Sequence, residues 1–129
     1  MVIDSSAFMV LLLDEPERDA FRQAIEADPV RLASAATLLE CSIVALGRLG
    51  EPGLAELRVV LATVGAETVA FGAQHLEGAI DAFRFYGKGR HPAGLNFGDC
   101  YSYALAKATG EPLLFKGDDF PHTDVRRAA

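Results

Sequence analysis

Short apolar segments alternate with longer helical segments along this chain, and that alternation limits the possible folds more than any other feature of the sequence. The apolar segments are 2–4, 31–34, 68–71 and 113–115, and 123–125 could form one more short strand. Strands that are joined through helices run parallel, because the helix carries the chain back to the starting edge of the sheet. We therefore predict an α/β fold: a three-layer α/β/α sandwich with a short central parallel sheet and helices on both faces.

The helices are predicted from the spacing of apolar residues and from capping and breaking residues. They cover 7–13, 17–27, 36–46, 51–64, 73–85 and 97–108. Ser5 or Ser6 is expected to cap the first helix, Gly47 to end the third, and Asn96 to cap the last. In the helix at 73–85, the residues expected on the inner side are Leu76, Ile80 and Phe83.

Length, charge and cysteine content narrow the class of protein. The chain has 129 residues, the usual size of one domain, so residues 1–129 are treated as a single domain. The formal net charge is −6, which argues against a protein that grips nucleic acid with a broad basic face. The two cysteines form no CxxC unit, so neither a zinc ribbon nor a disulfide framework is expected. No apolar run reaches the roughly 18 residues of a membrane helix, and Asp4 precedes the longest run where a secretion signal would carry Lys or Arg. We expect a soluble cytoplasmic protein.

Four acidic residues stand where a charge is unexpected. Asp4 and Asp118 each follow an apolar strand, so both are predicted at the carboxyl edge of the sheet, where open α/β sheets bind ligands. Glu40 lies inside an apolar helix, where an unpaired charge is costly. Asp99 lies in the first turn of the helix at 97–108. Converging carboxylates without a matching Lys or Arg are typical ligands of a hard divalent cation, so together the four acids predict a metal site.

Each acid also has an ordinary structural explanation. Asp4 could cap the first helix, and Asp99 in a first turn is favourable with the helix dipole. Glu40 forms a capping-box pattern with Thr37, although the apolar residues before Thr37 indicate an earlier helix start. Asp118 lies in a Gly-Asp-Asp segment of the kind found in turns. One such acid would carry little weight, whereas four in one small α/β domain favour the metal site.

The order of these motifs resembles that of one known family. Val-Ile-Asp-Ser-Ser at 2–6, the isolated Glu40, Leu-Asn-Phe-Gly-Asp-Cys at 95–100 and Leu-Phe-Lys-Gly-Asp-Asp-Phe at 114–120 resemble PIN domains of the VapC toxin type. The segment Tyr-Gly-Lys-Gly-Arg-His-Pro-Ala at 86–93 is typical of one branch of that family. The resemblance spans essentially the whole chain. It implies a Mg²⁺- or Mn²⁺-dependent endoribonuclease that is the toxin of a type II toxin–antitoxin system and leaves a 5′ phosphate and a 3′ hydroxyl.

The resemblance also implies which residues form the site. Asp4, Glu40 and Asp99 match the acidic positions of the family. The fourth acidic position can be matched in two ways. The family pattern is Thr-x-Asp-x-Asp-Phe, and the segment Phe-Lys-Gly-Asp-Asp-Phe at 115–120 has one residue fewer between its parts. Counting forward from the strand favours Asp118, and counting back from the following Phe favours Asp119. We take Asp118 with the first three acids as catalytic and metal-binding, and keep Asp119 as a further metal ligand.

Contacts with substrate and partners are expected around this site. Arg84, Lys88 and Arg90 are expected to hold the RNA backbone through its phosphates, with solvated surface charge as the alternative explanation. Ser6 is assigned to the same substrate-contacting group and is expected to help hold the site through its hydroxyl, with helix capping as its alternative. The expected partners are RNA, with tRNA among the candidates, a small antitoxin that inserts Arg or Lys toward the carboxylates, and a second copy of the chain.

Two other functions stay open. A Mg²⁺ phosphohydrolase with Asp4 as nucleophile would share the acid at the end of the first strand, but such enzymes generally need a second acid at the position of Ser6. A catalytically silent PIN-like module would bind a partner protein without cleaving RNA. The complete acidic set argues against that module, because a degenerate domain tends to lose one of its acids.

Overall fold

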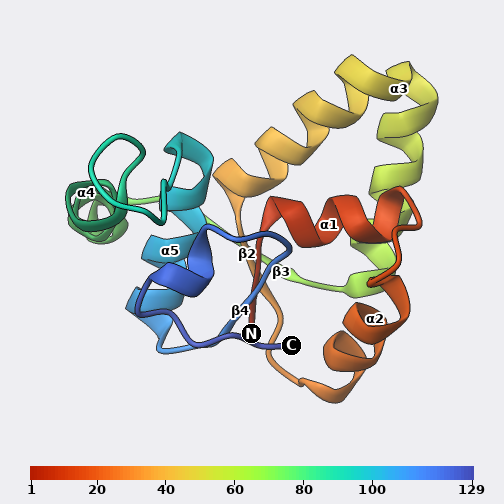
Figure 1. The fold of residues 1–129 in the computed structure, drawn as a ribbon. Coiled ribbons are helices and arrows are strands. Elements are labelled where there is room, and N and C mark those ends of the chain that lie inside the picture. The colour runs from red at the N-terminus through yellow and green to blue at the C-terminus, as the bar shows by residue number, and fades with distance from the viewer.

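Four short parallel strands form one sheet in the order β3-β2-β1-β4 in the computed structural model, which describes residues 1–129 (Figure 1). The strands are β1 (Val2–Ile3), β2 (Leu32–Ser34), β3 (Glu67–Val69) and β4 (Leu113–Leu114). The helices are α1 (Ser5–Leu12), α2 (Arg18–Ala27), α3 (Ala35–Val64), α4 (Ala73–Tyr86), α5 (Phe97–Thr109) and the short 3-10 turn η1 (Phe120–His122). The chain adds β2 and β3 on one side of β1 and then returns to place β4 on the other side. The carboxyl ends of β1 and β4 therefore flank the crevice where open α/β sheets bind ligands.

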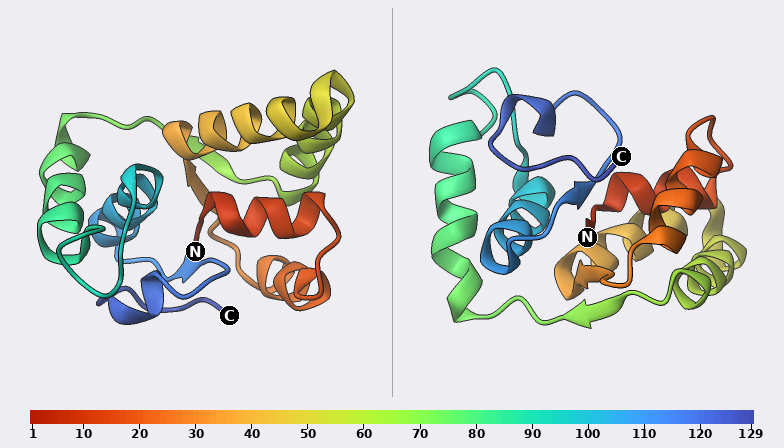
Figure 2. Two further views of the ribbon diagram at one scale, coloured as in Figure 1. Left: turned by 45° about the horizontal axis from the view of Figure 1, so that its top comes forward. Right: turned by 90° about the horizontal axis from the view of Figure 1, so that it is seen from below.

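The helices cover both faces of the sheet. Helices α1, α2 and α3 lie on one face and α4 and α5 on the other, as Figure 2 shows. Successive residues of a strand point to opposite faces, and in β1 both are apolar and fully buried. Ile3 packs with the first layer of helices and Val2 with the second. The predicted three-layer α/β/α sandwich with a short central parallel sheet is confirmed.

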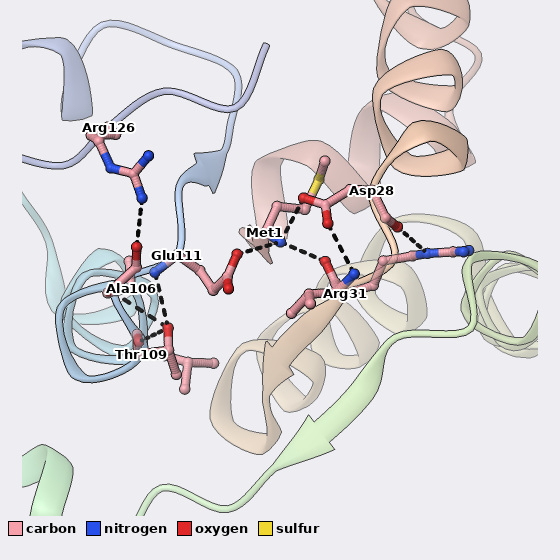
Figure 3. A network of polar contacts seen from close by, with 10 residues as sticks. Met1, Asp28, Arg31, Ala106, Thr109, Glu111 and Arg126 are labelled. Carbon is pink, nitrogen blue, oxygen red and sulfur yellow. Dashed lines mark hydrogen bonds and ion pairs between the residues drawn. The ribbon is translucent and has the colours of Figure 1, made fainter.

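A group of polar contacts holds the start of β1 (Figure 3). The Met1 ammonium lies 2.8 Å from a carboxylate oxygen of Asp28 and 3.1 Å from one of Glu111, and it donates to the backbone carbonyl of Val30. The side chain of Arg31 donates to the backbone carbonyl of Asp28. These contacts join β1 to the segments that precede β2 and β4, so the three strands are aligned at the edge opposite their carboxyl ends.

Helix α3 is longer than predicted and kinked, as the bend at the upper right of Figure 1 shows. The prediction that the helix ends at Gly47 is wrong: the helix continues through this residue, and a glycine inside a helix costs only about 1 kcal/mol relative to alanine, too little to end it. The break comes at Gly50, whose φ of 68° and ψ of −161° belong to a region essentially restricted to glycine. Pro52 lies in the first turn after the break, where its missing N–H is harmless. The helix predicted from residue 51 is therefore the second half of α3.

Helix α4 presents a different side to its neighbours than predicted. The expectation that Leu76, Ile80 and Phe83 lie inside is wrong, because 49%, 39% and 44% of these residues are exposed. The buried side carries Ala82, and Gly78 lies against α5. Small residues on this side let the two helices approach closely, which leaves the large apolar residues at the rim.

The remaining boundaries agree with the sequence to within one or two residues, with two differences in detail. Neither Ser5 nor Ser6 is the cap of α1, because the Asp4 carboxylate accepts from the backbone N–H of Ser6. The tail pairs with β4 through a bridge between Leu113 and Arg127, rather than through a strand at 123–125. The predicted cap of α5 at Asn96 is confirmed. None of the helices combines the length and apolar character needed to cross a membrane.

Candidate active site

A polar cavity of about 250 Å³ opens at the carboxyl edge of the sheet, between the ends of β1 and β4. Its lining includes every acid singled out from the sequence: Asp4, Glu40, Asp99, Asp118 and Asp119. These acids come from the end of β1, the second turn of α3, the first turn of α5 and the loop after β4. The rest of the lining consists of Ser5, Ser6, Asn96, Lys116, Gly117 and Phe120. Segments far apart in the sequence therefore bring their carboxylates to one place.

Asp4 is the most constrained of the acids, with only 2% of the residue exposed. Its Oδ2 accepts from the backbone N–H of Ser6 at 3.0 Å and from the Ser6 hydroxyl at 2.7 Å. The Ser6 hydroxyl in turn accepts from the backbone N–H of Lys116 at 3.0 Å. Ser6 therefore joins the end of β1 to the loop after β4, and its hydroxyl is engaged within the protein.

Two further hydroxyls that the sequence did not single out lie beneath Asp4. The buried Ser102 hydroxyl of α5 donates to Asp4 Oδ1 at 2.6 Å. A serine hydroxyl has one proton, and Ser102 gives it to Asp4, so the contact of 3.3 Å between Ser102 and Thr37 has Thr37 as its donor. Ser102 stands in an otherwise apolar stretch of α5 three residues after Asp99, and that position was the signal available in the sequence.

Glu40 and Asp99 approach each other from different helices. Glu40 is half-buried, and its carboxylate lies against Gly98, the residue before Asp99. Asp99 and Asn96 form a capping box, in which Asp99 Oδ2 accepts from the Asn96 backbone N–H at 3.0 Å and Asn96 Oδ1 accepts from the Asp99 N–H at 2.9 Å. Asp99 thus lies in the first turn of α5, as its ordinary explanation required, and takes part in a capping box that leaves its carboxylate at the cavity.

The electrostatics of the cavity are visible at Asp99. Burial raises the pKa of its carboxyl to about 7, against the lowering effect of the hydrogen bond from Asn96, and the negative charges of Asp4, Asp119 and Glu40 raise it further. Asp118 is not among the charges that act on Asp99. Of the two candidates for the fourth acid, Asp119 is therefore the one whose charge raises the pKa of the Asp99 carboxyl.

The basic residues expected to bind substrate lie outside the cavity. Arg84, Lys88 and Arg90 are all exposed, and Arg84 forms an ion pair with Asp81. The backbone of Lys88 donates to the carbonyl of Leu95, directly before the Asn96 that lines the cavity. The loop that carries Lys88 and Arg90 is therefore attached to the rim of the site, whereas Arg84 lies in the last turn of α4.

The chemistry of the cavity suits a hard cation. Apart from Lys116, every ionisable group in its lining is a carboxylate, and the Lys116 ammonium pairs with Glu15 and Glu17 instead. The five acids have no ion-pair partner. As they stand, no three Asp, Glu, His or Cys side chains lie close enough together to share one ion. The donors therefore fit a divalent metal in kind, and the side chains at the cavity would have to draw together to hold it.

Comparison with known proteins shows the family. The PIN domain family matches residues 1–126. The chain is 52% identical to Ribonuclease VapC30 of Mycobacterium tuberculosis over 129 residues, which is 100% of this chain and 98% of that protein. It is also 52% identical to Ribonuclease VapC of Mycolicibacterium smegmatis over 125 residues, which is 97% of each chain.

Solved structures agree with this result at the level of the fold. VapC20 of Mycobacterium tuberculosis, a toxin that cleaves the sarcin-ricin loop, superimposes with a TM-score of 0.76 at 15% identity, covering 96% of this chain and 95% of that one. A toxin–antitoxin complex from Klebsiella pneumoniae gives a TM-score of 0.68 at 19% identity, covering 95% of this chain and 92% of that one. Since its full-length relatives are VapC proteins and its sequence matches the PIN pattern from end to end, the chain belongs to the VapC ribonucleases of the PIN domain family.

Proposed function

We propose that this chain is an endoribonuclease, the toxin of a type II toxin–antitoxin pair, and that it hydrolyses RNA phosphodiester bonds with a divalent cation as cofactor. The observation that carries the proposal is that acids from four separate segments line one and the same cavity. This cavity lies between β1 and β4, where the order of the strands reverses. The names of the full-length relatives support a ribonuclease. We expect the protein to act in the cytoplasm, where its RNA substrates are.

The residues that would hold Mg²⁺ or Mn²⁺ are Asp4, Glu40, Asp99 and Asp119. Such a cation, when bound, lowers the pKa of a water molecule and offsets the charge that develops on the phosphodiester. The protein contributes orientation: Ser6 and Ser102 fix both oxygens of Asp4, and Asn96 fixes one oxygen of Asp99. We prefer Asp119 to Asp118 as the fourth acid because Asp119 acts on Asp99 and Asp118 does not.

The RNA would reach the site along surfaces that carry cations. Lys88 and Arg90 stand on the loop that ends at Asn96, so they are suited to phosphates on one side of the scissile bond. On the other side, a groove of about 320 Å³ between α1 and α3 shares Ser6, Glu40 and Lys116 with the cavity and has Arg48 in its lining. Arg48 forms no ion pair within the chain, so its guanidinium is free to bind a phosphate.

Two protein partners complete the proposal. The uncompensated acids of the cavity suit a basic segment of a small antitoxin, which would block the site by inserting Arg or Lys among them. An exposed apolar surface made by α3, α4 and α5 suits a second copy of the chain; its most exposed members are Leu39, Ile43 and Phe97. The Klebsiella pneumoniae protein of similar fold was solved as a toxin–antitoxin complex, which supports the first of these partners.

The test is cleavage by purified, antitoxin-free protein. A panel of tRNA, rRNA and mRNA should be cut in Mg²⁺ or Mn²⁺ and stay intact when EDTA is present. Asp4→Asn and Asp99→Asn should each lower the rate by about 100-fold or more, because each removes one charge from the cation site without changing the shape of the side chain. Glu56→Gln is the matched control, since Glu56 is an exposed acid on α3 outside the cavity, and it should cleave like the wild type.

The result also separates the rival functions. An intact RNA panel with either metal would contradict a nuclease and favour the silent binding module. Hydrolysis of small phosphate esters without RNA cleavage would favour the phosphohydrolase. Cleavage that persists in EDTA would contradict the proposed dependence on a divalent cation. Cleavage that persists in Asp99→Asn would contradict the proposed active site.

A further inference from the structure

At Gly98 of α5 the backbone conformation would accept any residue, but the neighbouring side chain leaves no room for a Cβ atom. Its φ is that of an ordinary helical residue, so the conformational freedom of glycine is not used. A Cβ atom at this position would lie 2.7 Å from Cδ of Glu40, 3.1 Å from its Oε1 and closer still to its Oε2. Carbon atoms do not approach a carboxylate that closely, so any larger residue would displace the side chain of Glu40.

Two other helical glycines, Gly47 and Gly78, are different, whereas Gly53 of α3 is crowded by its own helix rather than by a residue of the cavity. A Cβ at Gly47 in α3 would meet nothing within 4 Å, and one at Gly78 in α4 would touch Ala104 at an ordinary 3.6 Å. Because alanine favours a helix over glycine, each of these glycines makes its helix less stable than alanine would. At Gly98 the same loss of helix stability is accompanied by a benefit, because the absent side chain leaves room for the carboxylate of Glu40.

The space at Gly98 decides where Glu40 lies. The Glu40 carboxylate lies against Gly98 in the first turn of α5, and Gly98 is the residue directly before Asp99. Moved outward by a side chain at 98, the carboxylate would no longer be held against this turn.

We propose that Gly98 is a positioning residue, whose missing side chain lets the Glu40 carboxylate lie against α5 where it can share a divalent cation with Asp99. The proposal rests on the proposed function, because it concerns the same acidic cavity. It predicts that in the variant Gly98→Ala the stability of the fold and the affinity for metal change in opposite directions.

The experiment compares Gly98→Ala with the wild type in three measurements. The melting temperature without metal should be equal or higher, because alanine is the better helix former. The affinity for Mn²⁺, measured by calorimetry, should fall by about 10-fold or more, as for other changes that misplace a metal ligand. The rate of RNA cleavage should fall with it. Gly47→Ala is the matched control, and it should raise the melting temperature and leave Mn²⁺ binding and cleavage unchanged.

A double-mutant cycle shows whether Gly98 acts through Glu40. In the Glu40→Gln background, where the charge is already absent, Gly98→Ala should cause no further loss of Mn²⁺ affinity. Equal additional losses in both backgrounds would overturn the proposal. So would a lower melting temperature for Gly98→Ala, which would mark residue 98 as necessary for the fold.

The failure of this inference is distinguishable from the failure of the proposed function. If Glu40→Gln loses Mn²⁺ and cleavage but Gly98→Ala keeps both, the positioning role is wrong and the nuclease stands. If the wild type cleaves no RNA, the function is wrong, and a crystal structure of Gly98→Ala decides the positioning role by itself. A Glu40 carboxylate displaced from α5 would support that role, and an unmoved carboxylate would overturn it.

Discussion

Asp4 shows what a single side chain of this site requires. It is buried and makes no ion pair, and hydrogen bonds from Ser6 and Ser102 satisfy its two oxygens instead. The sequence indicated Asp4 and Ser6, because both follow directly from an apolar strand that ends at the start of a helix. Ser102 is 98 residues away from Asp4 along the chain, and no local pattern links the two. Such a bond follows only from the packing of α5 against β1.

The choice between Asp118 and Asp119 can be settled by one pair of variants. Both side chains are exposed neighbours on the same loop, so Asp118→Asn and Asp119→Asn are matched controls for each other. Asp119→Asn should lower the rate of RNA cleavage by about 10- to 100-fold, because Asp119 is coupled to Asp99. Asp118→Asn should cleave nearly like the wild type. The reverse order of the two rates would make Asp118 the fourth acid, as counting forward from the strand suggested.

Asp99 makes the stability of the metal-free protein depend on pH. Its pKa is raised from 3.8 to about 7, so between these values the folded protein holds a proton that the unfolded chain has released. Stability therefore falls as the pH rises from about 4 to about 7. Asp99→Asn should remove this fall and, at pH 8, increase the free energy of unfolding by an amount on the order of 2 kcal/mol, once the shift is reduced for partial exposure to solvent.

Denaturant unfolding in EDTA at several pH values measures this effect. The difference between Asp99→Asn and the wild type should grow from pH 4 to pH 7 and then level off. A difference that is constant over this range would show that the Asp99 carboxyl titrates normally. Mn²⁺ affinity of the wild type should rise over the same interval, because the cation competes with the proton.

Among the elements, the strands were predicted best although they are the shortest. β1 and β4 contain two residues each, too few to show any period. They were recognised because each is fully apolar, lies beside a helix signal and is followed within a few residues by an acid. The same rule placed the acids at the carboxyl edge, because all strands of a parallel sheet end there. Topology therefore supplied most of the candidate site.

The helices show what periodicity leaves undetermined. In α4 the stripe of Leu76, Ile80 and Phe83 was recognised correctly, but a stripe does not say whether it faces the core or another surface. In α3 both Gly47 and Gly50 resemble a helix end, and the difference between them is the backbone conformation, which is non-helical only at Gly50. Fold class and acids could be read from local patterns, whereas facing directions and the contacts of Ser102 and Gly98 depend on the assembled structure.

Acids without a basic partner gather at the proposed site, and they account for much of the net negative charge of the whole molecule. The chain has 18 acidic and 12 basic residues, and without Asp4, Glu40, Asp99 and Asp119 its formal net charge of −6 would be −2. Bound divalent cations would offset this local charge, so the acidity of the chain does not oppose an RNA substrate. The net charge excludes a basic-face RNA binder, as expected, and is compatible with a nuclease that handles phosphates at one cavity.

The outer surface of the molecule carries the last prediction, which concerns its oligomeric state. Phe97 is 78% exposed and stands between two apolar hollows, one of about 440 Å³ lined mainly by α4 and α5 and one of about 250 Å³ lined mainly by α3. Phe97 and Tyr101 line both hollows, so the apolar surface is continuous across α3, α4 and α5. A projecting ring beside hollows is self-complementary under two-fold symmetry, since each copy can insert its Phe97 into the other.

Phe97→Asp should therefore convert a dimer into a monomer, because it would bury two charges at the centre of the interface. Light scattering during size-exclusion chromatography measures the mass, at a concentration where the wild type is dimeric. Val59→Asp is the matched control: Val59 is 66% exposed on the second half of α3 but lines neither hollow, so the variant should stay dimeric. A dimeric Phe97→Asp protein would exclude this surface as the interface. A monomeric wild type would leave the same surface available to the antitoxin, and binding of the antitoxin should then be lost in Phe97→Asp.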